Sequence, residues 1–281
     1  MANLIYEVTD VALYESADYQ YNLALVLGTD SASFMVTDEA KLLAFRSYSF
    51  QKRGFFDLSD AFQELYLQDK LLSLSFQQVN VAVVHKAFTF VPDELFDASK
   101  MELYLENVVE PPINDLIQAD VLTSNAARTV YTLNSNLRNS LHEKYIAVKI
   151  QHIMSPTINA LSVHQSSVLS FDDTLYLQVR DQTLQIVCFR NREFVFANYF
   201  EYQSANDIAY YMMLVINQLG MKQQDVSILL SGQLERKSEI FNTLYRYIQK
   251  IDFLDYRSRH IVPESFETIP FHTCFDALAT L

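Results

Sequence analysis

The chain has few of the residues that build phosphate loops, disulfide bonds or membrane spans. Its 281 residues include four glycines, two cysteines and no tryptophan. Glycine-rich turns let backbone amides approach a phosphate, so four glycines cannot furnish several such loops. No apolar run is long enough to cross a bilayer, and the first twenty residues lack the pattern of a secretory signal. We therefore expect a cytoplasmic protein without a membrane partner.

Basic residues are also scarce. The chain has 21 lysines and arginines against 34 aspartates and glutamates, which gives a formal net charge of −13. A nucleic-acid-binding protein needs a basic surface for the phosphate backbone, so this acidic chain is not expected to bind nucleic acid. The two cysteines, Cys188 and Cys274, are far apart among apolar neighbours, which predicts buried, reduced thiols.

Apolar residues are plentiful, at 50% of the chain, and they occur in a repeated pattern. The segments 23–50 and 175–202 align without a gap at a constant offset of 152. The alignment places Leu25 on Leu177 and Phe34 on Ile186, and short polar turns separate the apolar runs in both segments. Such turns between alternating apolar runs are typical of antiparallel hairpins, so each half is predicted to begin with three strands.

The elements that follow are again parallel in the two halves. Ser204 and Asp207 form a capping box before a helix that ends at Gly220, and Asp57 or Ser59 can cap the corresponding helix. A fourth strand is predicted over 79–85 and, at an offset of 147, over 226–232. A second helix is predicted over 93–108 and over 235–251. This order predicts an α/β protein whose sheets are mixed, as in α+β folds, and are covered by helices.

The order of elements resembles the duplicated ribonuclease-H-like fold of the actin, sugar-kinase and heat-shock-chaperone ATPase superfamily. The segments "FTFVPDELFD", "NREFVFANYFEYQSANDIAYYMMLVINQLG" and "ILLSGQLERKSEIFNTLYRYI" are similar to a bacterial family of unknown function that is assigned this actin-like ATPase fold. The resemblance implies two ribonuclease-H-like lobes, 1–160 and 161–281. Their boundary is expected between 151 and 172, where "SPTINALSVHQSS" supplies proline and serine.

The resemblance also implies where a nucleotide would bind. A superfamily ATPase usually has the pattern Asp, any residue, Gly in the first hairpin of each lobe. Here the first lobe has Gly28, Thr29 and Asp30 in the opposite order, the second has no glycine between Arg180 and Thr183, and only Ser231 and Gly232 stand at the adenosine loop. A residual site for ATP and magnesium would comprise Asp30, Asp181 and Gly232.

We therefore expect a degenerate nucleotide site and a non-catalytic binding or scaffolding protein with a protein partner and no cofactor. A nucleotide-binding switch, or an ATPase with diverged phosphate loops, stays open as the alternative. In the superfamily the two hairpin turns face each other, and we expect Asp30, Arg180 and Asp181 to close the space between the lobes.

The remaining polar residues form no catalytic pattern in the sequence. Ser231 lacks the glycine that a nucleophile elbow requires two residues earlier. The pair Asp172 and Asp173 is predicted to form a solvated turn. Structural or surface roles are expected for the histidines His142, His152 and His164, which lack metal-ligand spacing. Core packing and a protein interface are both open for the tyrosines Tyr245, Tyr247 and Tyr256.

Overall fold

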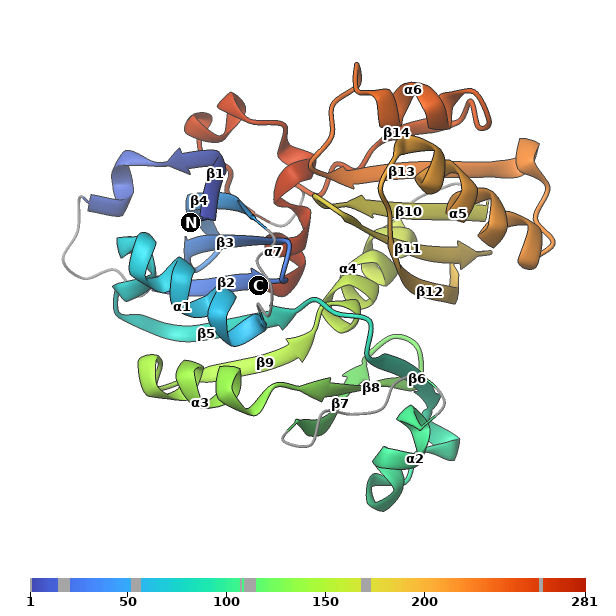
Figure 1. The fold of residues 1–281 in the computed structure, drawn as a ribbon. Helices are drawn as coiled ribbons and strands as arrows, with labels where there is room; N and C mark the ends of the chain where they lie inside the picture. Colours follow the sequence, from blue (N-terminus) through green and yellow to red (C-terminus); the bar gives the residue numbers. More distant parts are fainter. Residues whose placement is uncertain are drawn as a thin grey trace. The chain divides into compact units, whose positions relative to one another are not determined.

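The computed structural model describes residues 2–14, 21–51, 57–106, 108, 115–167, 173–257 and 260–281, and the chain in it forms two compact units (Figure 1). The first unit holds residues 1–159, 257–269 and 276–281, and the second holds 160–256 and 270–275. Two C-terminal segments thus belong to the first unit, whereas the expected lobes, 1–160 and 161–281, place them in the second.

The first unit is built on a mixed sheet with the strand order β1-β4-β3-β2-β5-β9. The neighbours from β1 to β2 are antiparallel, whereas β5 and β9 run parallel to β2. The strands are β1 (Ala2–Thr9), β2 (Tyr21–Leu27), β3 (Ser31–Asp38), β4 (Lys41–Phe50), β5 (Phe76–Val83) and β9 (Val148–His152). Strand β3 is buried along nearly its whole length, so this sheet is covered on both faces.

The second unit has a sheet of the order β12-β11-β10-β13-β14. Its strands are β10 (Asp173–Val179), β11 (Thr183–Arg190), β12 (Glu193–Glu201), β13 (Val226–Gly232) and β14 (Ile251–Phe253). Helices α5 (Ala205–Gln218) and α6 (Glu239–Tyr245) contribute Met212, Ile216 and Leu244 to the core over this sheet. The predicted capping box of Ser204 and Asp207 is confirmed, and Cys188 and Cys274 are buried and form no disulfide bond, as expected.

The sequence repeat is present in the strand register. Leu25 is paired with Phe34 across β2 and β3, and the residues at the offset of 152, Leu177 and Ile186, are paired across β10 and β11. The pairing with each third strand also shifts register at the same place, between Val36 and Thr37 of β3 against β4 and between Cys188 and Phe189 of β11 against β12. The offset of the fourth strand is different from the prediction, because β5 and β13 correspond at 149 and not at 147.

The predicted helix over 93–108 is wrong. The segment forms two 3₁₀ turns and the short helix α2 (Met101–Leu105), whose apolar side chains pack on a small core of Val91, Leu105 and Val130. This core belongs to a three-stranded antiparallel sheet of β6 (Phe88–Pro92), β8 (Ala127–Leu133) and β7 (Leu116–Leu122). The helix that precedes β9, as α6 precedes β14, is α3 (Ser135–Lys144).

The segment 151–172, in which the boundary between the lobes was expected, contains a helix, and the chain passes from the first unit to the second within it. Helix α4 (Met154–Ser167) begins with Pro156 in its first turn, where a missing N–H group costs no helical hydrogen bond. Met154, Ile158 and Leu161 are fully buried at helical spacing. Proline and serine in this segment therefore mark a helix start. The other helices are α1 (Leu58–Gln68), which Asp57 caps, and α7 (Phe275–Thr280).

Candidate functional site

The first hairpin turn of the first unit joins β2 to β3. The Gly28 N–H donates to the Ser31 carbonyl at 2.9 Å, and the Phe50 N–H donates to the Asp30 carbonyl at 2.7 Å. The Asp30 side chain is buried and accepts from the Ser31 hydroxyl at 3.0 Å. A Cβ atom added to Gly28 would lie 3.0 Å from the Asp30 Oδ1 atom. The carboxylate therefore lies over its own turn, at the place where a side chain on residue 28 would begin.

The corresponding turn of the second unit has the same backbone bonds without a glycine. The Arg180 N–H donates to the Thr183 carbonyl at 2.9 Å, and the Tyr202 N–H donates to the Gln182 carbonyl at 3.0 Å. The Tyr202 hydroxyl donates to the Arg180 carbonyl at 2.5 Å. Arg180 is buried, whereas Asp181 is exposed. Both turns are thus closed hairpins. In each, the backbone N–H of the first turn residue donates to a carbonyl of the same turn.

Gly232, the third candidate, is explained by strand packing. Its φ is +96°, and an added Cβ atom would lie 2.0 Å from the Val179 carbonyl oxygen. The Gln233 N–H donates to this same carbonyl at 2.8 Å, as the Val84 N–H donates to the Leu27 carbonyl in the first unit. The glycine permits the end of β13 to approach β10, which accounts for it without a ligand. The neighbouring Ser231 hydroxyl is buried and donates to the Gln178 side chain, so it is not an exposed nucleophile.

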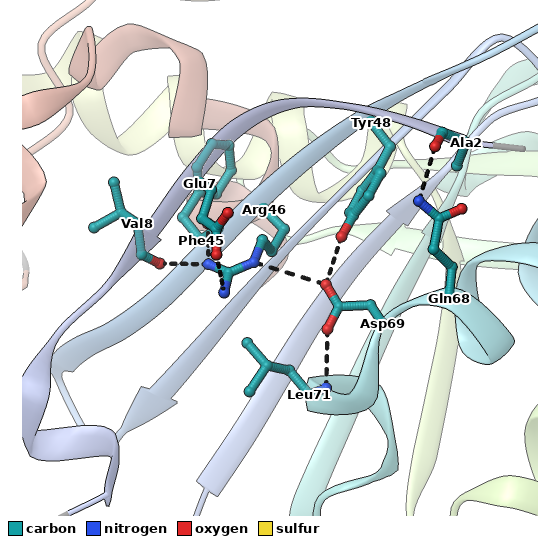
Figure 2. A network of polar contacts seen from close by, with 9 residues as sticks. All are labelled: Ala2, Glu7, Val8, Phe45, Arg46, Tyr48, Gln68, Asp69 and Leu71. Carbon is teal, nitrogen blue, oxygen red and sulfur yellow. Dashed lines mark hydrogen bonds and ion pairs between the residues drawn. The ribbon is translucent and has the colours of Figure 1, made fainter.

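An ion network that the sequence did not indicate, buried at Arg46 and Asp69 and exposed at Glu7, joins β1, β4 and the turn after α1 (Figure 2). The Arg46 guanidinium lies 2.8 Å from Glu7 and 3.7 Å from Asp69. Asp69 also accepts from the Tyr48 hydroxyl at 2.5 Å and from the Leu71 N–H at 2.9 Å. Burial, together with the Asp69 carboxylate, raises the pKa of Tyr48. Every charged group has a partner here, so the network fixes β1 on β4 and offers no open position for a substrate.

A second buried cluster contains aspartate, histidine and serine but does not form a catalytic triad. Asp120 of β7 accepts from the His152 backbone N–H and from the Ser155 hydroxyl, each at 2.8 Å. The His152 ring is bonded to the His85 carbonyl at 2.9 Å and to the Met154 N–H, so it is not bonded to serine or aspartate. Burial raises the pKa of Asp120 to about 6 and lowers the pKa of His85 to about 4. The cluster links the three-stranded sheet to β9 and α4.

Other sequence candidates have structural roles or lie apart. Asp173 is the first residue of β10 and pairs with Arg190 at 3.6 Å, so the solvated turn predicted there is wrong for Asp173, and Asp172 lies outside the described residues. Among the residues that the structure describes, no three His, Cys, Asp or Glu side chains are grouped to hold a metal ion. No described helix is long and apolar enough to cross a membrane.

The histidine and tyrosine candidates differ in burial. His152 is fully buried, His164 is half-buried and His142 is exposed. Tyr256 is a core residue, whereas Tyr245 and Tyr247 are 50% and 46% exposed.

Comparison with protein families assigns the chain to a family. Residues 13–251 match a family described as protein of unknown function (DUF3822). The chain belongs to this family. A search of curated proteins found no match to the DUF3822 chain.

Solved structures show that the DUF3822 chain has an actin-like ATPase fold. A Bacteroides thetaiotaomicron protein, described as having an actin-like ATPase fold and unknown function, is 23% identical with a TM-score of 0.75, covering 95% of this chain and 99% of its own. The PilM-PilN type IV pilus biogenesis complex includes a chain that is 11% identical with a TM-score of 0.67, covering 92% of this chain and 97% of its own. The predicted fold class and family resemblance are confirmed.

Proposed function

We propose that this DUF3822 protein is a cytoplasmic, non-catalytic binding or scaffolding protein on a degenerate actin-like ATPase fold. The observation that carries the proposal is the pair of first hairpin turns. In both turns the first amide closes the hairpin, and the second turn has no glycine that would let backbone approach a phosphate. An ATPase of this fold needs open amides at these turns, so the turns favour a role other than ATP turnover.

Two further features support the loss of a nucleotide site. The Asp30 carboxylate is buried against Gly28 and bonded to Ser31, so reaching a metal-bound phosphate would require it to leave that bond. Gly232 is accounted for by its close approach to Val179. Asp30 and Gly232 thus have structural explanations within their own units.

A protein partner fits the same fold and surface. PilM, whose fold is similar, is part of a complex with PilN, so the fold can serve protein assembly. Tyr245 and Tyr247 are exposed on the segment around α6, and tyrosines of this kind suit protein interfaces because a large apolar ring carries a polar tip. The acidic net charge of −13 favours a protein partner over nucleic acid.

A thermal unfolding scan with Mg-ATP, Mg-ADP and Mg-GTP tests this proposal. We expect no stabilisation by any of the three, whereas a ligand at 100 times its dissociation constant would add about 2.7 kcal/mol to the free energy of unfolding. Titration calorimetry and a phosphate-release assay should likewise give no signal.

The alternative is a nucleotide-binding switch or ATPase that uses Asp30, Asp181 and Gly232 with ATP and magnesium. The exposed carboxylate of Asp181, at the turn of the second unit, favours this candidate. Saturable nucleotide binding that Asp181→Ala abolishes, with unchanged unfolding temperature, would replace the scaffold proposal with the switch. Glu201→Ala, a change of another exposed carboxylate, is the matched control.

A further inference from the structure

Equivalent strands of the two units have different neighbours. At the offset of 152, β4 of the first unit corresponds to β12 of the second, and each is the third strand of its hairpin series. In the first unit β1 adds antiparallel to the outer edge of β4. In the part of the second unit that the structure describes, β12 is the last strand of its sheet, with β11 as its neighbour (Figure 1). In the described part of the second unit, the outer side of β12 is therefore the edge of the sheet, whereas β1 pairs with the outer side of β4 in the first unit.

The burial of the two strands differs accordingly. Every residue from Leu42 to Tyr48 in β4 is buried, whereas none of the corresponding residues 194–200 in β12 is buried. In the first unit, β1 and the 3₁₀ turn Val11–Tyr14 after it contact β4. The exposed area on β12 is therefore the area that an added strand covers in the repeat.

The edge lacks the charged and proline residues that often keep sheet edges from pairing, and its bulge opposite Cys188 and Phe189 has a counterpart in β4, to which β1 adds. Between Glu193 and Glu201 the strand reads "FVFANYF", with no charged residue and no proline. Natural proteins usually protect a long edge strand with lysine, proline or an inward-pointing charge. An unprotected edge rich in aromatic and β-branched residues is suited to accept another strand.

We propose that β12 is a docking edge for an extended segment of a partner protein, which adds antiparallel to the sheet as β1 adds to β4. This inference rests on the proposed function as a binding protein and names the surface that would serve it. Backbone hydrogen bonds to β12 would supply affinity, and alternate side chains over Phe196 and Phe200 would supply selectivity.

The charges at the ends of β12 identify the partner's chemistry. Glu193 and Glu201 are both exposed. Full-length antiparallel pairing of two copies of β12 about Ala197 would place Glu193 of each copy opposite Glu201 of the other, and like charges directly opposite are destabilising. The ends therefore disfavour a second copy and select a segment with apolar alternation and a basic residue opposite a glutamate.

The first unit also supplies the register of the added strand. Asn3 of β1 is opposite Ser49, and Glu7 is opposite Arg46. The corresponding residues of β12 are Glu201 and Asn198. A strand in this register should thus have a basic residue at the position of Asn3 and no need of an acid at the position of Glu7.

The test uses the full chain and two labelled peptides with the sequence of residues 2–9. One carries Asn3→Lys and Glu7→Gln, and the other carries Asn3→Glu and Glu7→Gln. We expect the lysine peptide to bind more tightly by roughly 1.5-fold to fivefold in fluorescence anisotropy, the range of an opposite-charge cross-strand pair. The Glu201→Lys variant should reverse this order, which a merely destabilised protein would not do. Hydrogen exchange should show slowed amides in residues 193–201 when the lysine peptide is bound.

Four results would overturn the inference. They are failure of both peptides to bind, peptide binding that leaves the β12 amides unprotected, an order of affinities that Glu201→Lys does not change, and a dimer in sedimentation whose β12 amides are protected without peptide. The nucleotide scan separates this inference from the proposed function. Failure of the peptides with no nucleotide binding removes only the docking edge, whereas nucleotide binding removes the scaffold proposal itself.

Discussion

At the scale of single residues, Asp120 is a carboxyl group held in a largely buried position by three hydrogen-bond donors. The His152 N–H, the Ser155 hydroxyl and the Tyr131 hydroxyl all donate to it, at 2.8, 2.8 and 3.3 Å. These bonds favour the ionised form, but desolvation is the larger effect and raises the pKa to about 6. Asp120 therefore makes the stability of the first unit depend on pH.

The pH dependence has a definite sign. Between about pH 4 and pH 6 the folded chain keeps a proton on Asp120 that the unfolded chain has lost, because the ordinary pKa of aspartate is about 3.9. The contribution of Asp120 to stability is therefore largest at low pH and declines as pH rises through this window. Asp120→Asn should remove the decline, so the free energy of unfolding of the native protein relative to the variant should fall by about 1 to 2 kcal/mol from pH 4.5 to pH 7.

Urea unfolding of both proteins at several pH values measures this difference. Burial lowers the pKa values of the neighbours His85 and His152, so their contribution to the free energy of unfolding falls as pH falls, which is opposite to the effect of Asp120. Both histidines are present in the native protein and in the variant, so their contribution cancels in the difference between the two. A native-minus-variant difference that is constant across the window would contradict the expectation.

At the scale of elements, the end of β13 is the place where a glycine meets a neighbouring strand. We expect Gly232→Ala to destabilise the protein by about 3 kcal/mol or more, because the new Cβ atom would lie 2.0 Å from the Val179 carbonyl oxygen. Gly220→Ala is the matched control. It also has a positive φ, of +63°, but nothing lies within 4 Å of its Cβ position, so about 1 kcal/mol is expected. Thermal unfolding compares the two, and equal losses would show that φ alone matters.

The sequence allowed the hairpins to be predicted but not the elements added to them. Leu25 and Leu177 occur in clear alternation with polar turns beside them, so strand and register followed from period 2. Strand β1 pairs with β4 from far along the chain, and nothing local to Ala2–Thr9 specifies that partner. Helix α4 was missed because serine and proline were weighed above the buried spacing of Ile158 and Leu161. Gly232 was named as a candidate because the resemblance places it at the adenosine loop, and its close approach to Val179 cannot be seen in the sequence.

At the scale of the whole molecule, the chain leaves the first unit within α4 and later returns to it. The Ile261 N–H donates to the Ala40 carbonyl at 2.9 Å, and the Leu42 N–H donates to the Ile261 carbonyl at 3.1 Å. At the C-terminus the Asn80 side chain donates to the Leu281 carbonyl at 3.0 Å. The first unit is therefore completed by residues that follow the whole second sheet in sequence.

Fragment complementation tests this dependence. A fragment of residues 1–159 should unfold at lower urea concentration than the same fragment mixed with a peptide of residues 257–281, because the peptide restores the backbone bonds to residues 40 and 42. A peptide with Ile261→Pro, which cannot donate to Ala40, should restore less. Circular dichroism gives the midpoints, and the expectation fails if the native peptide leaves the midpoint unchanged.

The return of the chain also sets an order of events during synthesis. Ile261 follows Lys41, its bridge partner, by 220 positions. At translation rates of about 5 to 20 residues per second, β4 leaves the ribosome on the order of 10 to 40 s before the segment that completes its hydrogen bonds. Throughout that interval the nascent first unit carries an unfinished strand end while the second unit is being made. Residues 257–269 and 276–281 thus join the first unit only after the second sheet has been translated, and synthesis that stops after residue 256 would leave the first unit without the backbone bonds between Ile261 and residues 40 and 42.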